Sequence, residues 1–183
     1  APNRRYNRLR TNARVEISVG LNEIWTLLEG SAAPAPSGVW MVTNESPRGF
    51  ALAHVEGPLA PIRVGEVVGL RTRDARGCHV CVVRWVLSDN PEHIELGLEE
   101  IASTARPARV RKLRSKDDTI HAALLLPELP GQAQAPSIIT PLMPLDSTCE
   151  LCIGELQAKL HMRPSRVVER TSSVQLLQFN SVP

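Results

Sequence analysis

The sequence has 183 residues, of which 43% are hydrophobic and 22% are charged. These proportions are close to those of an average globular protein, so they exclude a disordered chain, and the length suits one large domain or two small ones. The net charge is only +2, which is too small to make the whole surface attract nucleic acid.

The chain opens with a basic arm. Arg4, Arg5, Arg8, Arg10 and Arg14 occur within its first 14 residues, and no acidic residue lies among them. In an extended arm, the spacing of Arg4 and Arg8 separates the two side-chain roots by up to roughly 13 Å. Arginine can fork onto a phosphate and can pair with O6 and N7 of guanine. The arm is therefore either a solvated tail or a grip for a compact anionic ligand.

Alternating and apolar segments next predict six β-strands. They cover residues 15–19, 38–42, 50–55, 66–73, 78–87 and 93–101. Gly, Pro, Asn and Asp fall between these segments, and short strands with such regular turn signals favour a closed antiparallel barrel or a sandwich. The segment 21–29 is ambiguous, because it fits either a turn of helix or the continuation of a strand pair.

A polar junction connects two of the expected strands, from Asn44 to Gly49. Its last four residues, Ser46-Pro47-Arg48-Gly49, fit a type I turn. The amide of Asn44 can both donate and accept hydrogen bonds, as the edge of guanine requires. The hydroxyl of Ser46 is a further ligand group, and Gly49 lets the backbone approach a ligand closely. The junction alone fits a plain turn as well as a ligand site.

Taken together, the Arg-x-x-x-Arg arm, the strand after it and the Asn-x-Ser-x-x-Gly junction resemble the PilZ domain family. Members are six-stranded β-barrels that bind cyclic di-GMP. Residues 80–85 and 94–99 resemble the closing hairpin of that family, and the resemblance covers about residues 4–104. It implies an all-β protein whose first domain is a six-stranded antiparallel PilZ-like barrel.

The same resemblance implies a set of ligand-binding residues. Arg4 and Arg8 are expected to hold guanine and phosphate, and Asn44, Ser46 and Gly49 to line the opposite side. Three further arginines complete the expected set at lower rank, namely Arg5, Arg10 and Arg48.

A competing register of the arm also exists, because Arg10 and Arg14 repeat the same spacing. Arg14 adjoins the strand that begins at Val15, which leaves less freedom for an arm to close over a ligand. We therefore prefer Arg4 and Arg8 as the binding pair.

The character of the chain changes near Arg114. A second basic cluster occupies residues 106–116, and the polar residues 115–118 read as a linker. Apolar segments follow at 122–126, 138–142, 149–153, 156–169 and 174–179. Proline residues interrupt them, which predicts short or edge strands. We therefore divide the chain into a barrel with its arm at 1–114 and a second small β unit of unknown role at 115–183.

The cysteines form two Cys-x-x-Cys pairs, Cys78 with Cys81 and Cys149 with Cys152. The pairs lie much farther apart than the roughly 15–20 residues typical of zinc ribbons. On a strand, residues three apart also point to opposite faces, so one strand cannot direct both thiolates at one metal. We expect packing thiols and no metal site.

The sequence contains few patterns that are typical of catalytic sites. Glu99 and Glu100 are adjacent, so on a strand they face opposite sides and cannot act together as acid and base. None of the histidines recurs at metal-binding spacing with a carboxylate. Trp40 and Trp85 lie in expected strands, where we place them in the core. We therefore expect no enzyme and no cofactor.

The sequence predicts a cytoplasmic receptor for cyclic di-GMP that converts nucleotide binding into an altered contact with a protein partner. No apolar run reaches the roughly 20 residues needed to span a bilayer. One alternative is an interaction module that keeps the barrel but binds no nucleotide. Another is a small barrel that binds nucleic acid, which the scarcity of aromatic residues, 3%, disfavours. The chain begins at Ala1 without Met, as a piece of a longer protein would.

Overall fold

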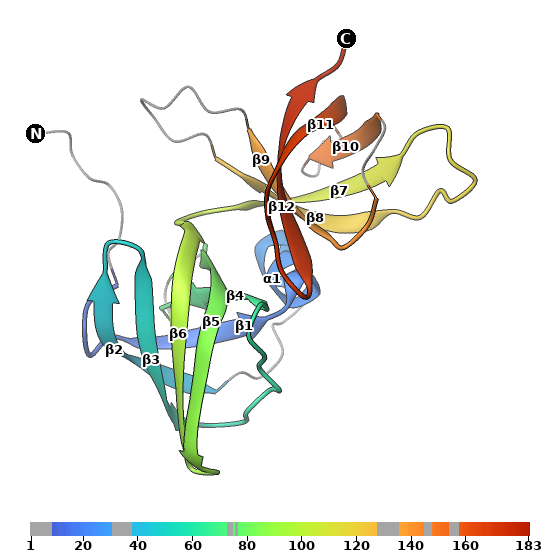
Figure 1. The fold of residues 1–183 in the computed structure, drawn as a ribbon. Coiled ribbons are helices and arrows are strands. Elements are labelled where there is room, and N and C mark those ends of the chain that lie inside the picture. The colour runs from blue at the N-terminus through green and yellow to red at the C-terminus, as the bar shows by residue number, and fades with distance from the viewer. Residues whose placement is uncertain are drawn as a thin grey trace, which may run out of the picture.

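The computed structural model describes residues 9–30, 38–72, 75, 77–127, 136–144, 148–153 and 158–183. In them, two closed antiparallel barrels follow one another along the chain (Figure 1). The strand order is β1-β2-β3-β6-β5-β4 in the first barrel and β10-β11-β12-β9-β8-β7 in the second. The all-β class, the six-stranded first barrel and the second β unit are thus confirmed.

The first barrel contains the six strands that the alternating and apolar segments predicted. They are β1 (Arg14–Val19), β2 (Val39–Ser46), β3 (Gly49–Glu56), β4 (Val67–Arg71), β5 (His79–Asn90) and β6 (His93–Ala102). In β1 the side chains of Val15 and Ile17 point inward, so the strand has the period-two burial that its sequence predicts. The core of the first barrel also includes Trp40, which is 1% exposed, as expected.

The second barrel contains β7 (Arg106–Lys112), β8 (His121–Leu126), β9 (Ser137–Pro141), β10 (Cys149–Ile153), β11 (Ala158–Arg170) and β12 (Val174–Ser181). Strand β7 pairs with β8 and β10, so it belongs to this barrel, although we expected residues up to 114 to belong to the first domain. The reason is that Ala108 and Val110 alternate inward and supply the second core. The polar stretch at 115–118 connects β7 and β8 within one barrel and is no linker between domains.

Proline does not confine the second unit to edge strands. Strand β11 runs through Pro164 and pairs on one side with β10 and on the other with β12. The ladder to β12 is irregular between Pro164 and Arg166, because a bulge accommodates a residue that has no N–H to donate.

Helix α1 (Leu21–Glu29) settles the ambiguous segment and lies between the barrels (Figure 1). Leu21 and Ile24 are buried in an apolar cluster with Leu124 and Val174 of the second barrel. The indole Nε1 of Trp25 donates a hydrogen bond of 2.8 Å to the carbonyl oxygen of Ala108. The helix therefore joins the two barrels. In the part of the chain that the structure describes, no helix is long and apolar enough to cross a membrane.

Candidate functional site

A hollow of about 340 Å³ lies on the outside of the first barrel, beside the turn between β2 and β3. Strands β2 and β3 line one side, and β5 and β6 line the other, because β3 pairs with β6 and β6 with β5. The lining residues are Asn44, Glu45, Ser46, Arg48, Gly49, Phe50, Ala51, Arg84, Trp85, Gly97, Leu98 and Glu99. The structure thus brings together Asn44, Ser46, Arg48 and Gly49, all of which the sequence singled out.

The turn itself is a well-fixed hairpin. The hydroxyl Oγ of Ser46 accepts a hydrogen bond of 3.3 Å from the backbone N–H of Arg48. The carbonyl of Arg48 accepts one of 2.8 Å from the N–H of Glu100, which ties the turn to β6. A register shift between Val42 and Asn44 marks a bulge in β2 just before the turn. The side chains of Asn44, Ser46 and Arg48 are exposed and free to meet a ligand.

Glycine is required at Gly49 because β3 and β6 approach closely there. A Cβ atom at this position would lie far inside contact distance of the carbonyl oxygen of Leu98. Only a residue without a side chain allows this approach, so Gly49 is required for strand packing, whereas the sequence suggested a close approach of the backbone to a ligand.

Trp85 lines the hollow, which corrects the expectation that it belongs to the core. It is 44% exposed, and its indole covers Gly97, where a Cβ atom would collide with the ring. Cys81 and Val83 point into the core, so strict alternation would also place Trp85 inside. A register shift between Val83 and Trp85 turns the tryptophan outward instead. Alternation alone contains no signal for that bulge.

Arg84 is a second lining residue that the sequence analysis did not identify. Its Nε donates to Glu99 Oε2 at 2.7 Å, within the first barrel. Its Nη1 and Nη2 donate to the two carboxylate oxygens of Glu169 on β11, at 2.5 and 3.0 Å. These bonds lower the pKa of Glu169 and raise that of Arg84, so both groups stay ionised. One guanidinium therefore faces the hollow and also holds the second barrel.

The expected arm residues Arg4, Arg5 and Arg8 lie outside the described residues. The chain just after them is well anchored, since Leu9 is 5% exposed and packs in the first core. The N–H of Asn12 donates to the carbonyl of Val42 on β2 at 2.7 Å. Arg10 is exposed and does not line the hollow.

The second basic residue of the competing register is held in a strand. Arg14 lies in β1 and is paired in register with Met41 of β2. Strand pairing therefore fixes the backbone of Arg14, and this constraint was the reason for preferring Arg4 and Arg8 as the binding pair.

The two Cys-x-x-Cys pairs lie on different barrels. Cys81 packs inside the first core, and Cys78 packs in the cluster between the barrels, so the two thiols face opposite sides of the strand. Burial raises the pKa of Cys78 to about 11 and that of Cys81 well above its ordinary value. Neutral thiols are poor metal ligands. Within the described residues, no group of three or more His, Cys, Asp or Glu side chains could hold a metal ion.

The adjacent carboxylates behave as the strand pattern predicted. Glu99 pairs with Arg84, whereas Glu100 lies 3.3 Å from Nδ1 of His79. The two groups therefore have separate partners and do not form an acid–base pair.

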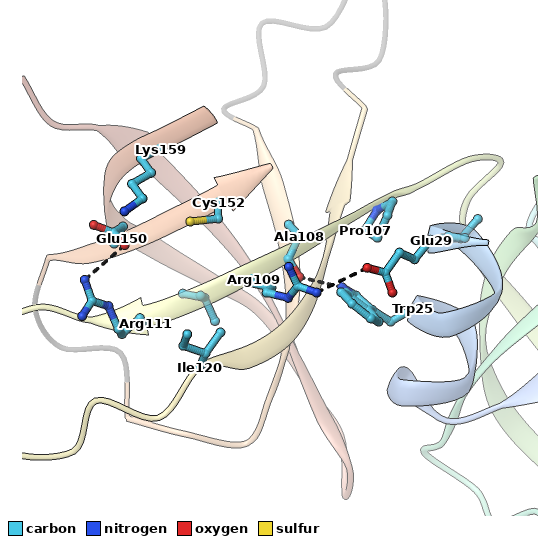
Figure 2. A pocket seen from close by; sticks show the side chains of 12 residues that line it. Trp25, Glu29, Pro107, Ala108, Arg109, Arg111, Ile120, Glu150, Cys152 and Lys159 are labelled. Atoms are coloured by element: carbon cyan, nitrogen blue, oxygen red, sulfur yellow. Dashed lines mark hydrogen bonds and ion pairs between the residues drawn. The ribbon is translucent and has the colours of Figure 1, made fainter. Parts of the chain in front are cut away.

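A larger hollow of about 560 Å³ lies between α1 and the second barrel (Figure 2). Its arginines are already paired, Arg109 with Glu29 at 3.3 Å and Arg111 with Glu150 at 3.2 Å. The guanidinium of Arg109 also stacks 4.7 Å from the ring centre of Trp25. None of the residues singled out for ligand binding lies here, so the hollow beside the β2–β3 turn is the candidate site.

Comparison with known proteins finds two family models that match adjacent parts of the chain. The middle PilZ domain of the cyclic-di-GMP receptor FimW matches residues 29–107, and the C-terminal beta-barrel domain of FimW matches residues 108–182. A curated relative, the cyclic-di-GMP receptor FimW of Pseudomonas aeruginosa, is 29% identical over 135 residues. The match covers 73% of this chain but only 21% of that protein.

Two solved structures are similar at a lower level. One is MrkH, described as a c-di-GMP-dependent transcription regulatory factor, with 10% identity and a TM-score of 0.29 over 97% of this chain and 88% of the other. The other is the complex of K. pneumonia MrkH with c-di-GMP, with 10% identity and a TM-score of 0.31 over 92% and 88%. These scores are too low to establish a common arrangement.

Proposed function

Because residues 29–107 match the middle PilZ domain of FimW, we infer that the chain belongs to the PilZ family. We propose that it binds cyclic di-GMP in the hollow beside the β2–β3 turn. One observation carries the proposal: Asn44, Ser46 and Gly49 line the same hollow as Arg84 and Trp85. Amide, hydroxyl, guanidinium and indole groups are the groups that recognise a purine nucleotide.

The basic arm supplies the other side of the proposed site. Leu9 is fixed in the barrel core, and the bond from Asn12 to Val42 holds the root of the arm beside β2. Asn44, which lines the hollow, is two residues farther along that strand. An extended chain spans up to about 3.6 Å per residue, so Arg8 and Arg4 are within reach of a ligand at the turn.

Trp85 provides a flat apolar surface for a base. Its indole packs on Gly97 and the residue remains 44% exposed, so part of the ring remains accessible to a base. Stacking of a base on an aromatic side chain contributes about 1–3 kcal/mol. We propose that Trp85 stacks on one guanine while the arm grips the phosphates.

The output of the receptor is a changed protein contact in the cytoplasm. The second barrel is joined to the first by α1 and by Arg84, so a ligand in the hollow lies next to a residue that holds both barrels. A ligand can move such an equilibrium only if it binds one arrangement more tightly than the other.

Calorimetric titration with cyclic di-GMP tests the proposal. We expect saturable binding by the wild type, a loss of about 10- to 100-fold in affinity for Arg8→Ala, and a similar direction for Ser46→Ala, since each removes a hydrogen bond to a charged ligand. Arg14→Ala is the matched control and should cost clearly less. GMP should bind much more weakly, because it supplies a single base.

The melting temperatures of the ligand-free variants provide the second control. Ser46 is exposed, and its one bond to Arg48 is long, so Ser46→Ala should leave the melting temperature nearly unchanged. If cyclic di-GMP bound neither better than GMP nor at all, the interaction-module alternative would replace the receptor. A greater loss for Arg14→Ala than for Arg8→Ala would reverse the register of the arm.

A further inference from the structure

Arg84 is shared between two carboxylates that belong to different barrels. Glu99 on β6 accepts a hydrogen bond from Nε of Arg84, and Glu169 on β11 accepts one from each of its two terminal nitrogens. The three side chains are about one-third to two-fifths exposed, so the group lies at the surface where the hollow meets the second barrel. Of the three, Arg84 and Glu99 line the hollow, and Glu169 is bonded to Arg84 without lining the hollow itself.

The charges of this group do not balance. One guanidinium faces two carboxylates, so the cluster carries a net negative charge beside the place proposed for an anionic ligand. Hydrogen bonds from Arg84 keep the pKa of Glu169 below its ordinary value, so its carboxylate is ionised at neutral pH. A phosphate brought to Arg84 would meet repulsion from both carboxylates.

We propose that Glu169 is an internal competitor for Arg84, so that the second barrel lowers the affinity of the hollow for the phosphate of its ligand. The inference rests on the proposed function. Carboxylate and phosphate groups both accept two parallel hydrogen bonds from a guanidinium. The terminal nitrogens of Arg84 can make such a bidentate pair with only one of these groups at a time. Glu169 therefore occupies the position that a phosphate would take.

Competition of this kind acts in both directions. If Glu169 weakens phosphate binding, then bound phosphate weakens the contact of Glu169 with Arg84 by the same free energy. The barrels remain joined, because Thr171 and Ser173 still donate to the carbonyl of Gly65, at 2.6 and 2.9 Å. The expected change is local and concerns the β11–β12 hairpin.

A double-mutant cycle measured by calorimetry tests the inference. Glu169→Gln should raise the affinity for cyclic di-GMP about three- to tenfold, because the competing charge is lost. In an Arg84→Ala background the same substitution should change the affinity less than twofold, since Glu169 acts through that arginine. A purely long-range effect of the Glu169 charge would persist in the Arg84→Ala background and would overturn the inference. Arg84→Gln replaces Arg84→Ala if the latter does not fold.

Glu99→Gln is the matched control, because it removes a carboxylate from the same guanidinium without touching the second barrel. Hydrogen exchange then separates the two variants. Cyclic di-GMP should speed exchange at residues 166–173 in the wild type and in Glu99→Gln. In Glu169→Gln the exchange there should already be fast without nucleotide.

The possible failures are distinguishable. Absence of cyclic di-GMP binding by the wild type would overturn the proposed function together with this inference. Binding by the wild type with the same affinity in Glu169→Gln would overturn the inference alone. Exchange at residues 166–173 that is unaffected by nucleotide would do the same.

Discussion

At the scale of single residues, two glycines shape the hollow in different ways. Gly49 lets β3 approach the backbone of β6, and Gly97 makes room for the ring of Trp85. At Gly49 the obstructing atom is a main-chain oxygen in a paired strand, which cannot move aside. At Gly97 the obstructing group is a surface side chain, which can rotate away. Both glycines line the hollow, but Gly49 is required for the packing of two strands, whereas Gly97 makes room for the ring of Trp85.

Gly49→Ala should lower the free energy of unfolding by about 1–3 kcal/mol, because the new methyl group forces two paired strands apart. Denaturant unfolding measures the change. Gly77→Ala is the control, since a Cβ atom there would meet nothing within 4 Å. Equal stability of the two variants would show that the close approach of β3 and β6 contributes nothing.

Sequence reasoning found one side of the candidate site and missed the other. Asn44, Ser46 and Gly49 stand in one short junction whose spacing is visible in the sequence. Arg84 and Trp85 come from a different strand, and a bulge turns Trp85 outward against the alternation of that strand. Bulges arise from the pairing of two strands, so one strand's own alternation cannot reveal them.

At the scale of elements, the hairpin of β11 and β12 contacts a residue that lines the hollow. Glu169 binds Arg84, and the next residues, from Thr171 to Ser173, donate to the carbonyl groups of Val64 and Gly65. Of these contacts with the first barrel, the pair of Glu169 with Arg84 is charged, and the hydrogen bonds from the hydroxyl groups are neutral. Only the charged contact depends on pH in the acid range.

We expect the contribution of Glu169 to stability to disappear in acid. Its pKa is lowered in the folded state, so the contribution is complete above the ordinary Glu value of 4.5 and is lost as the pH falls through the lowered pKa. Near neutral pH the wild type should exceed Glu169→Gln by about 0.5–1 kcal/mol, a figure suited to a partly exposed pair. Urea unfolding of both proteins at descending pH should show the gap closing. A gap that stayed constant down to about pH 3 would contradict the assignment.

The strands were easier to predict than their grouping. Alternating and apolar segments identified all six strands of the first barrel, because inward side chains must be apolar wherever one face is buried. Strand β7 has the same alternation, yet its arginines and the polar stretch after it placed it in the first domain. Pairing with β10, which begins at Cys149, decides its membership, and such long-range pairing leaves no local mark.

At the scale of the whole molecule, the two barrels share an apolar cluster in addition to their own cores. Leu21 and Ile24 of α1 pack there with Val67 and Val80 of the first barrel and Leu124 of the second. Sequence reasoning could place these residues inside, but it could not assign them to a contact between barrels. The shared cluster predicts that the barrels stabilise each other.

Ile24→Ala should destabilise both barrels. The side chain is fully buried, so its truncation should cost about 2–5 kcal/mol. Hydrogen exchange should accelerate in β4 and also in β8, which lie on opposite sides of the cluster. Leu52→Ala is the control, because Leu52 is equally buried but packs only in the first core, so its effect on β8 should be small. Protection of β8 that Ile24→Ala left unchanged would show that the barrels are energetically independent.

Each barrel is closed by strands that are contiguous along the chain, and this affects the order of assembly during translation. Strands β1 to β6 are complete at Ala102, so the first barrel can close while the ribosome is still making the second. Helix α1 has been synthesised by then, but Leu124 and Val174, which cover its apolar side, have not. The nascent chain therefore exposes an apolar surface that is fully covered only after β12 has been synthesised. A truncated product that stopped before Val174 would keep this surface exposed to chaperones.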